Sequence, residues 1–439
     1  MKHYDMIVIG FGKAGKTLAA KTAAQGKRVA MIEKDATMYG GTCINVGCIP
    51  TKVMITASEK GYDFKEVMAE KKAVVERLRA KNFGMLDTAP TADVYNASAR
   101  FIENKVIEIT SDAQTEQLTA DVIIINTGAV SNVLTIPGLK ESQHVYDSTG
   151  IQTLDQQPTR LGIIGGGNIG LEFAGLYAKL GTEVTVFDPV ERIFAREEEE
   201  ISKLAQSYME EDGVQFKLGT KIESLANQGD AVVITTDQGQ DTFDAVLYAT
   251  GRKPNTADLG LENTDIVLTE RGAIQVDEYC QTAVPNVFAV GDVNGGPQFT
   301  YVSLDDFRIV FNYLNGNTDY SHKNRHHVPY NTFINPPLAR VGIDEATAKA
   351  QGLNYKVNSL PVAGMPRAHV NGDLRGLFKA VVDADSQQIL GATLFGKEAH
   401  EVINLITMAM DNSIPYTYFQ KQIFTHPTMA ENLNDVFNF

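Results

Sequence analysis

The sequence is poor in cysteine, in positive charge and in long apolar runs. Only three cysteines occur in 439 residues, which is too few for a scaffold held by disulfides. Lys and Arg number 39 against 54 Asp and Glu, a formal net charge of −15, and such a balance repels nucleic-acid backbones. No stretch approaches the roughly 18–20 uninterrupted apolar residues of a membrane-spanning helix. We therefore expect no disulfide-rich module, no nucleic-acid partner and no membrane partner.

The amino-terminal segment does not have the pattern of a secretion signal. Residues 1–15 pass almost at once into a short apolar run and glycines, without a long apolar region followed by a small-residue cleavage site. We expect the mature chain to begin at Met1 and to be cytoplasmic. Its length predicts about three domains of roughly 150 residues each.

Two β-α-β units are predicted, far apart in the sequence. Residues 6–10 are apolar, 13–25 are helix-prone, and 28–33 form a second apolar run that ends in Glu33. The same order returns at 161–188, where the second strand ends in Asp188. A strand, a glycine loop, a helix and a strand ending in an acid are typical of dinucleotide-binding folds.

The rest of the chain predicts strands and helices around these units. Each half ends on a strand followed by Thr-Gly, at Thr127-Gly128 and at Thr250-Gly251. From about Val328 the pattern changes to an α+β domain without glycine fingerprints. Further elements are predicted at 64–81, 106–109, 122–125, 232–235, 245–248, 344–351, 376–382, 389–395 and 398–411.

The first glycine loop contains Gly10, Gly12 and Gly15 in the pattern G-x-G-x-x-G. The first glycine permits a tight turn, the second lets a pyrophosphate approach the backbone, and the third allows the helix to pack closely on the strand. Glu33, at the end of the following strand, would bind ribose hydroxyls. The loop is therefore a candidate dinucleotide site.

The same residues also match a phosphate loop of ATPases and GTPases. The segment 10–17, GFGKAGKT, satisfies G-x-x-x-x-G-K-[ST]. That interpretation predicts a later strand ending in a Mg²⁺-binding Asp. It gives no role to Glu33, to the second glycine loop or to the cysteine pair described below, so we keep it as an alternative from another functional class.

The second glycine loop contains Gly165, Gly167 and Gly170, again between a strand and a helix. An acid at Asp188 favours a free ribose 2′-hydroxyl and repels a 2′-phosphate, which predicts NADH rather than NADPH. Arg192 and Arg196 lie slightly further on and keep NADPH possible.

Two dinucleotide folds in one chain indicate two dinucleotides, which in electron transfer are usually a flavin and a nicotinamide. Residues 289–292 close a strand on Gly291 and Asp292, and the acid suits the ribityl chain of a flavin. We therefore expect FAD in the first site and NADH in the second.

Cys43 and Cys48 lie in the glycine-rich segment 40–52, GGTCINVGCIPTK. Buried small side chains or half of a metal site would be alternative explanations. No other cluster of Cys or His supplies the remaining metal ligands, and neighbouring glycines favour close approach to a planar cofactor. The pair therefore predicts a redox-active dithiol. We predict a structural role for Cys280 and no metal site, including at His326 and His327.

Three longer segments carry a resemblance to a known family. They are 38–52 (MYGGTCINVGCIPTK), 299–310 (FTYVSLDDFRIV) and 422–435 (QIFTHPTMAENLND). Over essentially its whole length the sequence resembles the class I pyridine nucleotide-disulfide oxidoreductases, which include dihydrolipoamide dehydrogenase, glutathione reductase and mercuric reductase. Within them it is most similar to bacterial flavoproteins of reactive-chlorine resistance.

The resemblance implies roles for the residues around the cysteine pair. Cys48 would be the thiolate nearer the flavin, and Cys43 would be the interchange thiol that attacks the substrate. Lys52 and Glu172 would form an ion pair near flavin N5, where the hydride arrives.

The resemblance also implies a catalytic base near the C-terminus. His426 would be the acid/base for Cys43, and Glu431 would hold its imidazole in the required tautomer. In this family both residues reach the disulfide from the partner subunit, so a homodimer is implied. The chemistry is consistent, because a thiolate nucleophile needs a nearby proton acceptor.

The implied fold is α/β, with two Rossmann-like domains that bind FAD and NAD(P) and a C-terminal α+β dimerisation domain. The domains would be 1–150 (FAD, first part), 151–272 (NAD(P)), 273–327 (FAD, central segment) and 328–439 (dimerisation). Residues implied for FAD are Gly10, Gly12, Gly15, Glu33, Lys34, Gly41, Thr42, Lys52, Thr127, Gly128, Gly291, Asp292 and Thr300. Those implied for NAD are Gly165, Gly167, Ile169, Gly170, Glu172, Asp188 and Gly251.

The implied reaction carries electrons from NADH to FAD, then to the dithiol and on to an external acceptor. We expect a metal ion such as copper, or a small molecule, as the acceptor, in defence against reactive chlorine or oxidative stress. Dihydrolipoamide dehydrogenase is the alternative enzyme, because its dithiol segment is nearly the same.

Overall fold

The structure is a computed structural model that describes residues 1–111 and 114–439. Within these residues the chain divides into two compact units. The first unit comprises residues 1–133, 148–154 and 250–325, and the second comprises 134–147, 155–249 and 326–439. The four predicted chain segments of the three domains are divided differently from these units, and their boundaries stay predictions.

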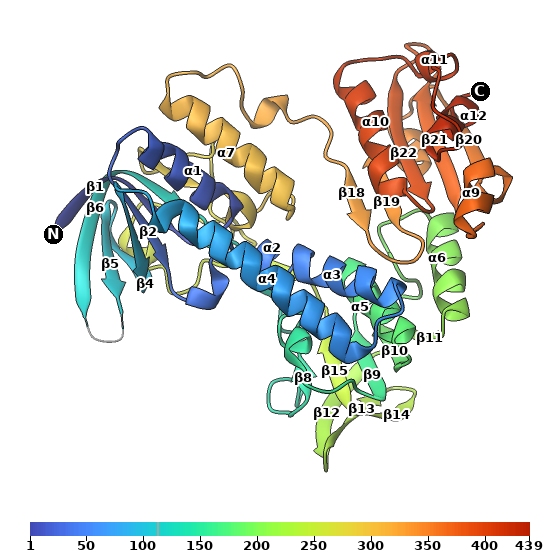
Figure 1. Ribbon diagram of the computed structural model, residues 1–439, viewed down its shortest axis with the longest axis horizontal. Helices are drawn as coiled ribbons and strands as arrows, with labels where there is room; N and C mark the ends of the chain where they lie inside the picture. Colours follow the sequence, from blue (N-terminus) through green and yellow to red (C-terminus); the bar gives the residue numbers. More distant parts are fainter. Residues whose placement is uncertain (112–113) are drawn as a thin grey trace. The chain divides into compact units, whose positions relative to one another are not determined.

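A twisted, mainly parallel sheet organises the first unit (Figure 1). Its order is β3-β2-β1-β6-β5-β4, and β17 also pairs with β6. The pairing of β1 with both β2 and β6 is parallel, which confirms the first predicted β-α-β unit. The strands are β1 (Lys2–Ile9), β2 (Val29–Glu33), β3 (Ala92–Asn96), β4 (Ser98–Glu103), β5 (Val106–Thr110), β6 (Thr115–Ile125) and β17 (Val287–Ala289). A separate pair joins β7 (Ala129–Ser131) to β16 (Arg252–Pro254).

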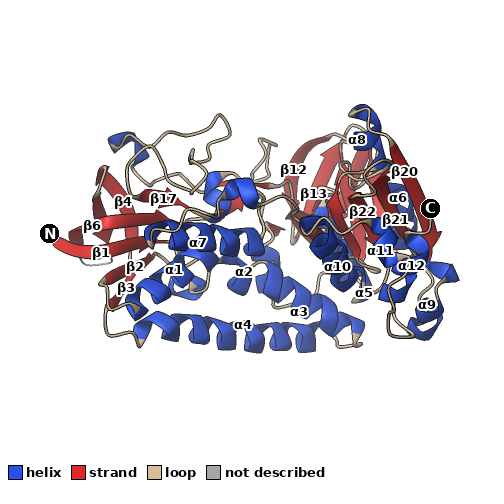
Figure 2. Cartoon of the chain, turned by 90° about the horizontal axis from the view of Figure 1, so that it is seen from above, coloured by secondary structure: helices blue, strands red, loops and turns tan. Residues whose placement is uncertain are grey.

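Helices cover one face of this sheet, as Figure 2 shows for α1, α4 and α7. Successive residues of β1 point to opposite faces, so Met6 and Val8 pack with the helices while Ile7 and Ile9 join the core on the other face. The helices are α1 (Lys13–Ala24), α2 (Thr42–Asn45), α3 (Cys48–Glu59), α4 (Phe64–Asp87) and α7 (Thr300–Leu314).

The second unit begins with the second β-α-β unit. Its parallel sheet has the order β11-β10-β9-β15-β8, beside an antiparallel sheet β12-β13-β14. The elements are β8 (Val145–Tyr146), β9 (Arg160–Ile164), α5 (Asn168–Lys179), β10 (Glu183–Asp188), α6 (Glu199–Glu211), β11 (Val214–Leu218), β12 (Ile222–Gln228), β13 (Ala231–Thr236), β14 (Gly239–Phe243) and β15 (Ala245–Tyr248).

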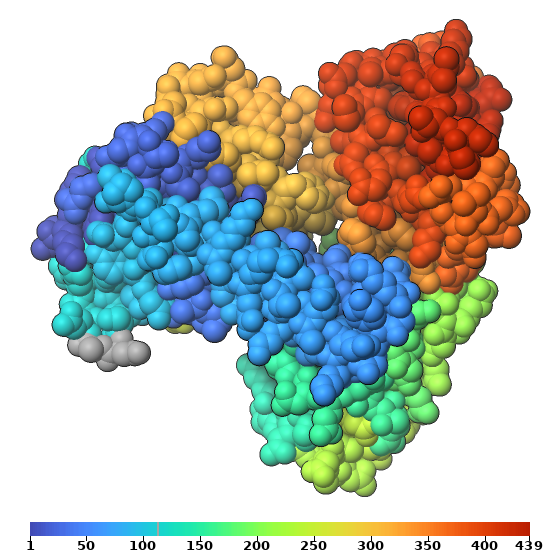
Figure 3. Space-filling model, in the orientation of Figure 1, coloured from blue at the N-terminus to red at the C-terminus, as the bar shows by residue number. Residues whose placement is uncertain are grey.

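The last hundred residues add an antiparallel sheet of order β18-β19-β22-β21-β20. Figure 3 shows residues from about 330 to the C-terminus as one continuous orange and red mass. Its core includes Phe378, Leu394, Ile403 and Phe437, all fully buried. The elements are β18 (Tyr330–Thr332), β19 (Leu338–Gly342), α8 (Glu345–Ala350), β20 (Tyr355–Pro361), α9 (Pro366–Asn371), β21 (Leu377–Asp383), β22 (Ile389–Phe395), α10 (Ala399–Asp411), α11 (Tyr416–Phe419) and α12 (Leu433–Val436). This confirms the predicted α+β region.

The predicted elements are present, and two of them extend furthest beyond their predicted bounds. The helix predicted at 64–81 continues to Asp87, and the strand predicted at 122–125 begins at Thr115. The helix gains a capping box at Asp63 and Glu66, which satisfies two backbone donors at its start. Among the described residues, no helix has the length and apolar character needed to cross a membrane.

Candidate active site

The first glycine loop is tightly enclosed by other backbone segments. Gly10 has φ +97°, a conformation that side chains rarely adopt. A Cβ on Gly12 would lie 2.5 Å from the Asn126 side-chain oxygen, and one on Gly41 would lie 2.7 Å from the Gly12 Cα. The loop therefore needs glycine at these positions, because only bare backbone fits.

The Asn126 side chain, at the end of β6, forms hydrogen bonds to two segments that are far from it in the sequence. Its Oδ1 accepts a hydrogen bond from the Gly15 N–H at 2.9 Å, and its Nδ2 donates to the Val290 carbonyl at 2.8 Å. The residue is 5% exposed, so both bonds lie away from water. The glycine loop and the strand that precedes Gly291 are thus held at the end of β6.

Glu33 lies at the end of β2 against the loop, as predicted. Its Oε2 accepts from the Phe11 N–H at 3.0 Å and its Oε1 accepts from the Asp35 N–H at 3.2 Å. Burial raises the pKa of the Glu33 carboxyl. The carboxylate therefore sits beside the loop, where a ribose would add hydrogen bonds to it.

The donor set of the first unit fits FAD. Gly291 has φ +73°, and a Cβ there would lie 2.9 Å from the Ser303 Oγ, which leaves room only for backbone beside Asp292. Gly12 supplies no side-chain cap at the start of α1, and the N–H groups of Ala14 and Gly15 donate to the Ser303 Oγ and the Asn126 Oδ1, so the start of the helix favours a pyrophosphate through the positive end of its dipole. The other residues predicted for FAD also belong to this unit: Lys34, Thr42, Lys52, Thr127, Gly128 and Thr300.

The lysine of the alternative phosphate-loop pattern is engaged elsewhere. Lys16 is 4% exposed, and its Nζ donates to the Gly40 carbonyl at 3.3 Å and to the Asn82 side chain. The Thr17 hydroxyl donates to the Lys13 carbonyl at 2.6 Å. In a nucleoside triphosphatase these two groups reach phosphate and Mg²⁺, so the arrangement disfavours that alternative.

The second glycine loop repeats the first with one change. The Asp188 Oδ2 accepts from the Gly166 N–H at 2.7 Å and its Oδ1 accepts from the Val190 N–H at 2.9 Å. A Cβ on Gly170 would lie 2.0 Å from the Gly165 carbonyl oxygen, but one on Gly167 would meet no described atom within 4 Å. The acid is in place, and the second glycine borders open space.

Glu172 lies in α5 after this loop and is 7% exposed. Its Oε1 accepts a hydrogen bond from the Phe333 N–H at 2.9 Å. Its predicted partner Lys52 belongs to the first unit, so their ion pair stays a prediction. Ile169 also lies in α5, whereas Gly251 belongs to the first unit.

The two cysteines lie at adjacent helix ends. Cys43 is in α2, and Cys48 is the first residue of α3, where the positive end of the helix dipole stabilises a thiolate. Neither sulfur forms a disulfide in this structure. A hydrogen bond to Cys48, together with burial, raises the pKa of the Cys43 thiol. The shared proton is therefore held on Cys43, which favours the thiolate at Cys48.

Thr300 adds a contact to the pair that the sequence did not predict. The resemblance implied Thr300 only as a residue of the FAD site, but its Oγ1 lies 3.6 Å from the Cys48 Sγ. A hydroxyl near a sulfur stabilises the thiolate form. The position follows from α7, which begins at Thr300.

His426 and Glu431 form the predicted pair in the second unit. The His426 Nδ1 lies 2.8 Å from the Glu431 Oε2, and the other carboxylate oxygen accepts from the Thr428 N–H at 3.1 Å. The hydrogen bond from His426 lowers the pKa of the Glu431 carboxyl. With Nδ1 at the carboxylate, Nε2 faces the opposite side of the ring. The imidazole is 69% exposed.

Sequence reasoning missed Asn126 and the hydroxyl of Thr300. A polar side chain directly after an apolar strand was visible at Asn126, next to the Thr-Gly pair that was noted. Its partners 111 and 164 positions away could not be found from local patterns.

Comparison with known proteins gives the same family throughout. The profile described as pyridine nucleotide-disulphide oxidoreductase matches residues 4–306, and its dimerisation domain matches 328–437. The chain is 44% identical to the probable pyridine nucleotide-disulfide oxidoreductase RclA of Escherichia coli, covering 100% of this chain and 99% of that protein. It is 31% identical to a dihydrolipoyl dehydrogenase of Chlamydia muridarum, covering 98% and 95% respectively.

Solved structures agree with these sequence matches. The chain resembles a copper(II) complex of the HOCl-induced flavoprotein disulfide reductase RclA from Escherichia coli with a TM-score of 0.97 at 44% identity. That match covers 100% of this chain and 99% of the other. A structure of RclA described without copper gives a TM-score of 0.96. These comparisons confirm the predicted fold class.

Proposed function

The chain belongs to the pyridine nucleotide-disulphide oxidoreductase family, and we propose that it uses NADH to reduce a Cys43–Cys48 disulfide through FAD, then reduces copper(II). The enzyme is a flavoprotein oxidoreductase dependent on FAD and a pyridine nucleotide, as its family is. One observation carries the finer proposal: Cys43 and Cys48 lie at adjacent helix ends, and the Cys48 Sγ lies 3.6 Å from the Thr300 Oγ1.

The cofactor assignment follows from the two glycine loops. FAD, when bound, accepts a hydride from the nicotinamide and delivers two electrons to the disulfide. Glu33 would hold its ribose and Asp292 its ribityl chain. In the second unit Asp188 would bind the NADH ribose, where its charge disfavours a 2′-phosphate.

The dithiol chemistry is divided between the two sulfurs. Cys48, at the start of α3 and 3.6 Å from the Thr300 hydroxyl, is suited to remain a thiolate facing the flavin. Cys43 retains the proton and, once deprotonated, is the nucleophile toward the substrate. His426 would take this proton at Nε2, because Nδ1 is held at Glu431.

A homodimer would bring this histidine to the cysteines. Residues 328–437 match a dimerisation domain, and its surface carries exposed apolar side chains: Met408 is 63% exposed, Tyr418 is 53% and Ile423 is 90%. Exposed apolar groups of this size mark protein interfaces. His426 lies three residues after Ile423, so dimerisation through this surface would place the imidazole at an interface.

Copper(II) is the acceptor that we propose. Solved complexes of the similar protein RclA contain copper(II), and thiolates are ligands that select copper(I). Oxidation of the dithiol to the disulfide releases two electrons and two protons. The two electrons reduce two copper(II) ions to copper(I). The similar protein RclA is HOCl-induced, which supports a role in defence against reactive chlorine. Such a dithiol would cycle in a reducing cytoplasm.

The alternative acceptor is lipoamide. The 31% identity to a dihydrolipoyl dehydrogenase over nearly the full length of both chains keeps this activity as the second candidate. It predicts fast NAD⁺-linked oxidation of dihydrolipoamide, which a copper reductase would lack.

An anaerobic titration of the holoenzyme with NADH, followed by copper(II) or lipoamide, tests the proposal. We expect long-wavelength charge-transfer absorbance after NADH, then its loss with formation of copper(I), measured with a copper(I)-specific chelator. Cys48→Ser should retain FAD but lose the charge-transfer band. Cys43→Ser cannot form the disulfide, so its band should be present before NADH is added, and copper reduction should be lost.

His426→Ala is the matched test of the proton acceptor. It should slow copper(II) reduction while leaving the rate of flavin reduction by NADH unchanged. Equal losses in both half-reactions would contradict the role of His426, and dihydrolipoamide turnover faster than copper reduction would favour the alternative.

A further inference from the structure

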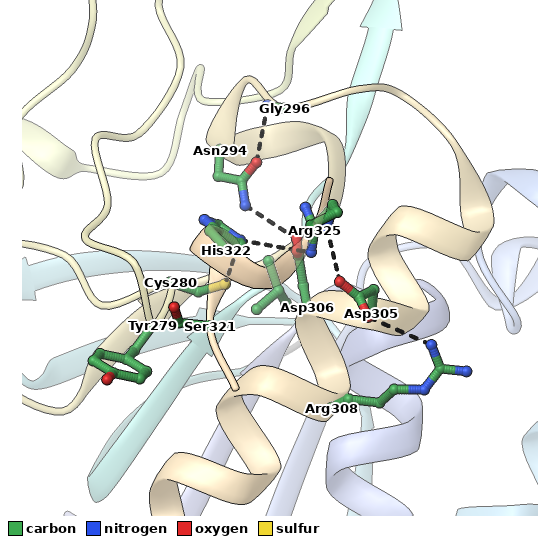
Figure 4. A network of polar contacts seen from close by, with 12 residues as sticks. Tyr279, Cys280, Asn294, Gly296, Asp305, Asp306, Arg308, Ser321, His322 and Arg325 are labelled. Atoms are coloured by element: carbon green, nitrogen blue, oxygen red, sulfur yellow. Dashed lines mark hydrogen bonds and ion pairs between the residues drawn. The ribbon is translucent and has the colours of Figure 1, made fainter. Parts of the chain in front are cut away.

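Cys280, Asp306 and His322 converge in the first unit, outside the redox dithiol (Figure 4). The Cys280 Sγ lies 3.2 Å from the His322 Nε2, and the same nitrogen lies 3.1 Å from the Asp306 Oδ1. The three ligand atoms all lie within 4.8 Å of one another. Cys280 precedes β17, Asp306 lies in α7, and His322 begins a short 3-10 turn.

Hydrogen bonds among these three side chains satisfy their polar atoms poorly when no cation is bound. An imidazole nitrogen carries either one N–H or one lone pair in the ring plane. With an N–H, Nε2 can donate fully to one neighbour only; with a lone pair, it can accept from the Cys280 thiol but meets the Asp306 oxygen without a proton between them. A cation at the point that the three atoms face would satisfy all of them.

We propose that Cys280, His322 and Asp306 bind one divalent thiophilic cation, of which Zn²⁺ is the representative. Thiolate, imidazole and carboxylate are its usual protein ligands, at about 2.3, 2.0–2.1 and 2.0–2.2 Å. Tetrahedral bonds of these lengths separate sulfur from nitrogen by about 3.6 Å and nitrogen from oxygen by about 3.3 Å. The observed 3.2 and 3.1 Å differ from these two separations by only a few tenths of an ångström, and the sulfur and the oxygen lie within 4.8 Å of each other. Water would take the fourth position.

Asp306 is oriented by further hydrogen bonds. Its Oδ2 accepts from the Gly291 N–H at 2.8 Å and from the Asn294 Nδ2 at 3.1 Å. The Arg325 Nη2 donates to its Oδ1 at 2.6 Å. Metal-binding carboxylates are typically held by outer hydrogen bonds of this kind, and here one of them comes from the predicted FAD loop.

The local charge also suits a bound cation. Arg325 contacts both Asp305 and Asp306 at 2.7 and 2.6 Å, and Arg308 also pairs with Asp305 at 3.4 Å, so two positive groups face two carboxylates. A thiolate at Cys280 would add a negative charge that these pairs do not balance. A cation bound to the thiolate offsets the cost of keeping that charge out of water.

The burial leaves one route to the site. Cys280 is 0% exposed and Asp306 is 1% exposed, whereas the His322 side chain is 27% exposed. An ion would therefore enter past the imidazole. The site would give Cys280 a structural role as a ligand, and the proposal differs from our expectation from the sequence that no metal site is present.

The test uses FAD-loaded protein carrying Cys43→Ser and Cys48→Ser, because the redox dithiol also binds soft metals. We expect this protein to bind one equivalent of Zn²⁺ in competition with a chelating indicator. Adding His322→Ala should weaken the binding at least about 100-fold, the upper range for losing even an outer partner of a ligand. Co²⁺ in place of Zn²⁺ should give a sulfur-to-cobalt charge-transfer band that Cys280→Ser abolishes.

The matched control is His327→Ala. His327 also contacts a carboxylate, with its Nδ1 2.8 Å from the Asp411 Oδ1, and its side chain is 28% exposed. This variant should bind Zn²⁺ as tightly as the parent. Absence of Zn²⁺ binding by the parent, or equal binding after His322→Ala, would overturn the proposal. FAD content and circular dichroism verify folding, and His322→Asn replaces His322→Ala if the latter does not fold.

Discussion

The two glycine loops have the same plan but differ in how they are enclosed. In each, an acid at the end of the second strand accepts a hydrogen bond from a backbone N–H of the loop, at Glu33 and at Asp188. In each unit a further strand pairs with the other side of the first strand, β6 in the first unit and β15 in the second. The residue that follows this strand differs between the two units. Asn126 and Ala249 each donate a backbone hydrogen bond to the end of the first strand, both at 2.8 Å, yet only Asn126 has a side chain that can bind the loop.

This difference fits the two cofactors that we propose for the loops, FAD in the first and NADH in the second. The first loop is covered by Gly41 and fixed to Asn126, so its shape is set before a ligand arrives. The second loop has open space beside Gly167. A pre-formed, enclosed site suits a prosthetic group that stays bound, and an open one suits a nicotinamide nucleotide that must leave in each turnover.

The largest expected effect is on the free energy of unfolding, and it comes from making the first glycine loop resemble the second. Asn126→Ala leaves the Gly15 N–H and the Val290 carbonyl buried without their partner. Each such group costs about 1–3 kcal/mol, so the free energy of unfolding should fall by about 2–6 kcal/mol. Urea denaturation of the holoenzyme measures this change. A loss below about 1 kcal/mol would mean that Asn126 does not fasten the loop.

Gly12→Ala and Gly167→Ala form a matched pair at the second glycine of each loop. The first change places a Cβ 2.5 Å from Asn126 Oδ1, which should cost about 1–3 kcal/mol and weaken FAD binding about 5- to 150-fold. The second change meets open space and should preserve FAD content and melting temperature. Flavin absorbance per mole of protein distinguishes them, and equal FAD loss in both would remove the contrast.

Asp188→Asn tests how the second loop selects its nucleotide. The amide keeps an acceptor for the Gly166 N–H but loses the charge that strengthens ribose binding and repels a 2′-phosphate. We expect the ratio of kcat/KM for NADH over NADPH to fall about fivefold, equivalent to about 1 kcal/mol. Steady-state kinetics with both nucleotides measures the ratio, and an unchanged ratio would assign selectivity to Arg192 or Arg196 instead.

Glu33→Gln should have the smallest effect, visible as a change in pH dependence. Burial raises the pKa of Glu33 above its ordinary value of 4.5, so the folded state binds this proton more tightly than the unfolded chain does. The stability of FAD-free protein should therefore decrease as the pH rises from about 4.5 through the raised pKa. Thermal melts across this range should show a shallower decrease for Glu33→Gln. Identical slopes would contradict the assignment.

Local patterns were sufficient for much of the fold and of the site. The glycine loops, their acids and the cysteine pair each lie within a short segment, where spacing alone reports the turn and the chemistry. The strand at 245–248 and the strand at 389–395 were predicted with the bounds that the structure has, because apolar runs and flanking turn residues define both.

Contacts between distant segments were not predictable in this way. Cys280 and His322 are 42 positions apart, and neither has a partner that sequence spacing could indicate. Thr300 meets Cys48 across 252 positions. Such pairs depend on how α7 packs on the sheet, which is decided by burial of the whole helix rather than by the residues that meet.

The pairing of β17 with β6 has a consequence for how the chain is made. Residues 123–125 of β6 pair with residues 287–289, and about 160 residues separate the two strands. At about 5–20 residues per second, a ribosome needs roughly 10–30 s to supply the missing strand. During that time one edge of an Ile-rich strand has no partner, and an unpaired apolar edge is prone to aggregation. Slow synthesis of residues 126–286 should therefore lower the yield of folded protein more than slow synthesis after residue 290.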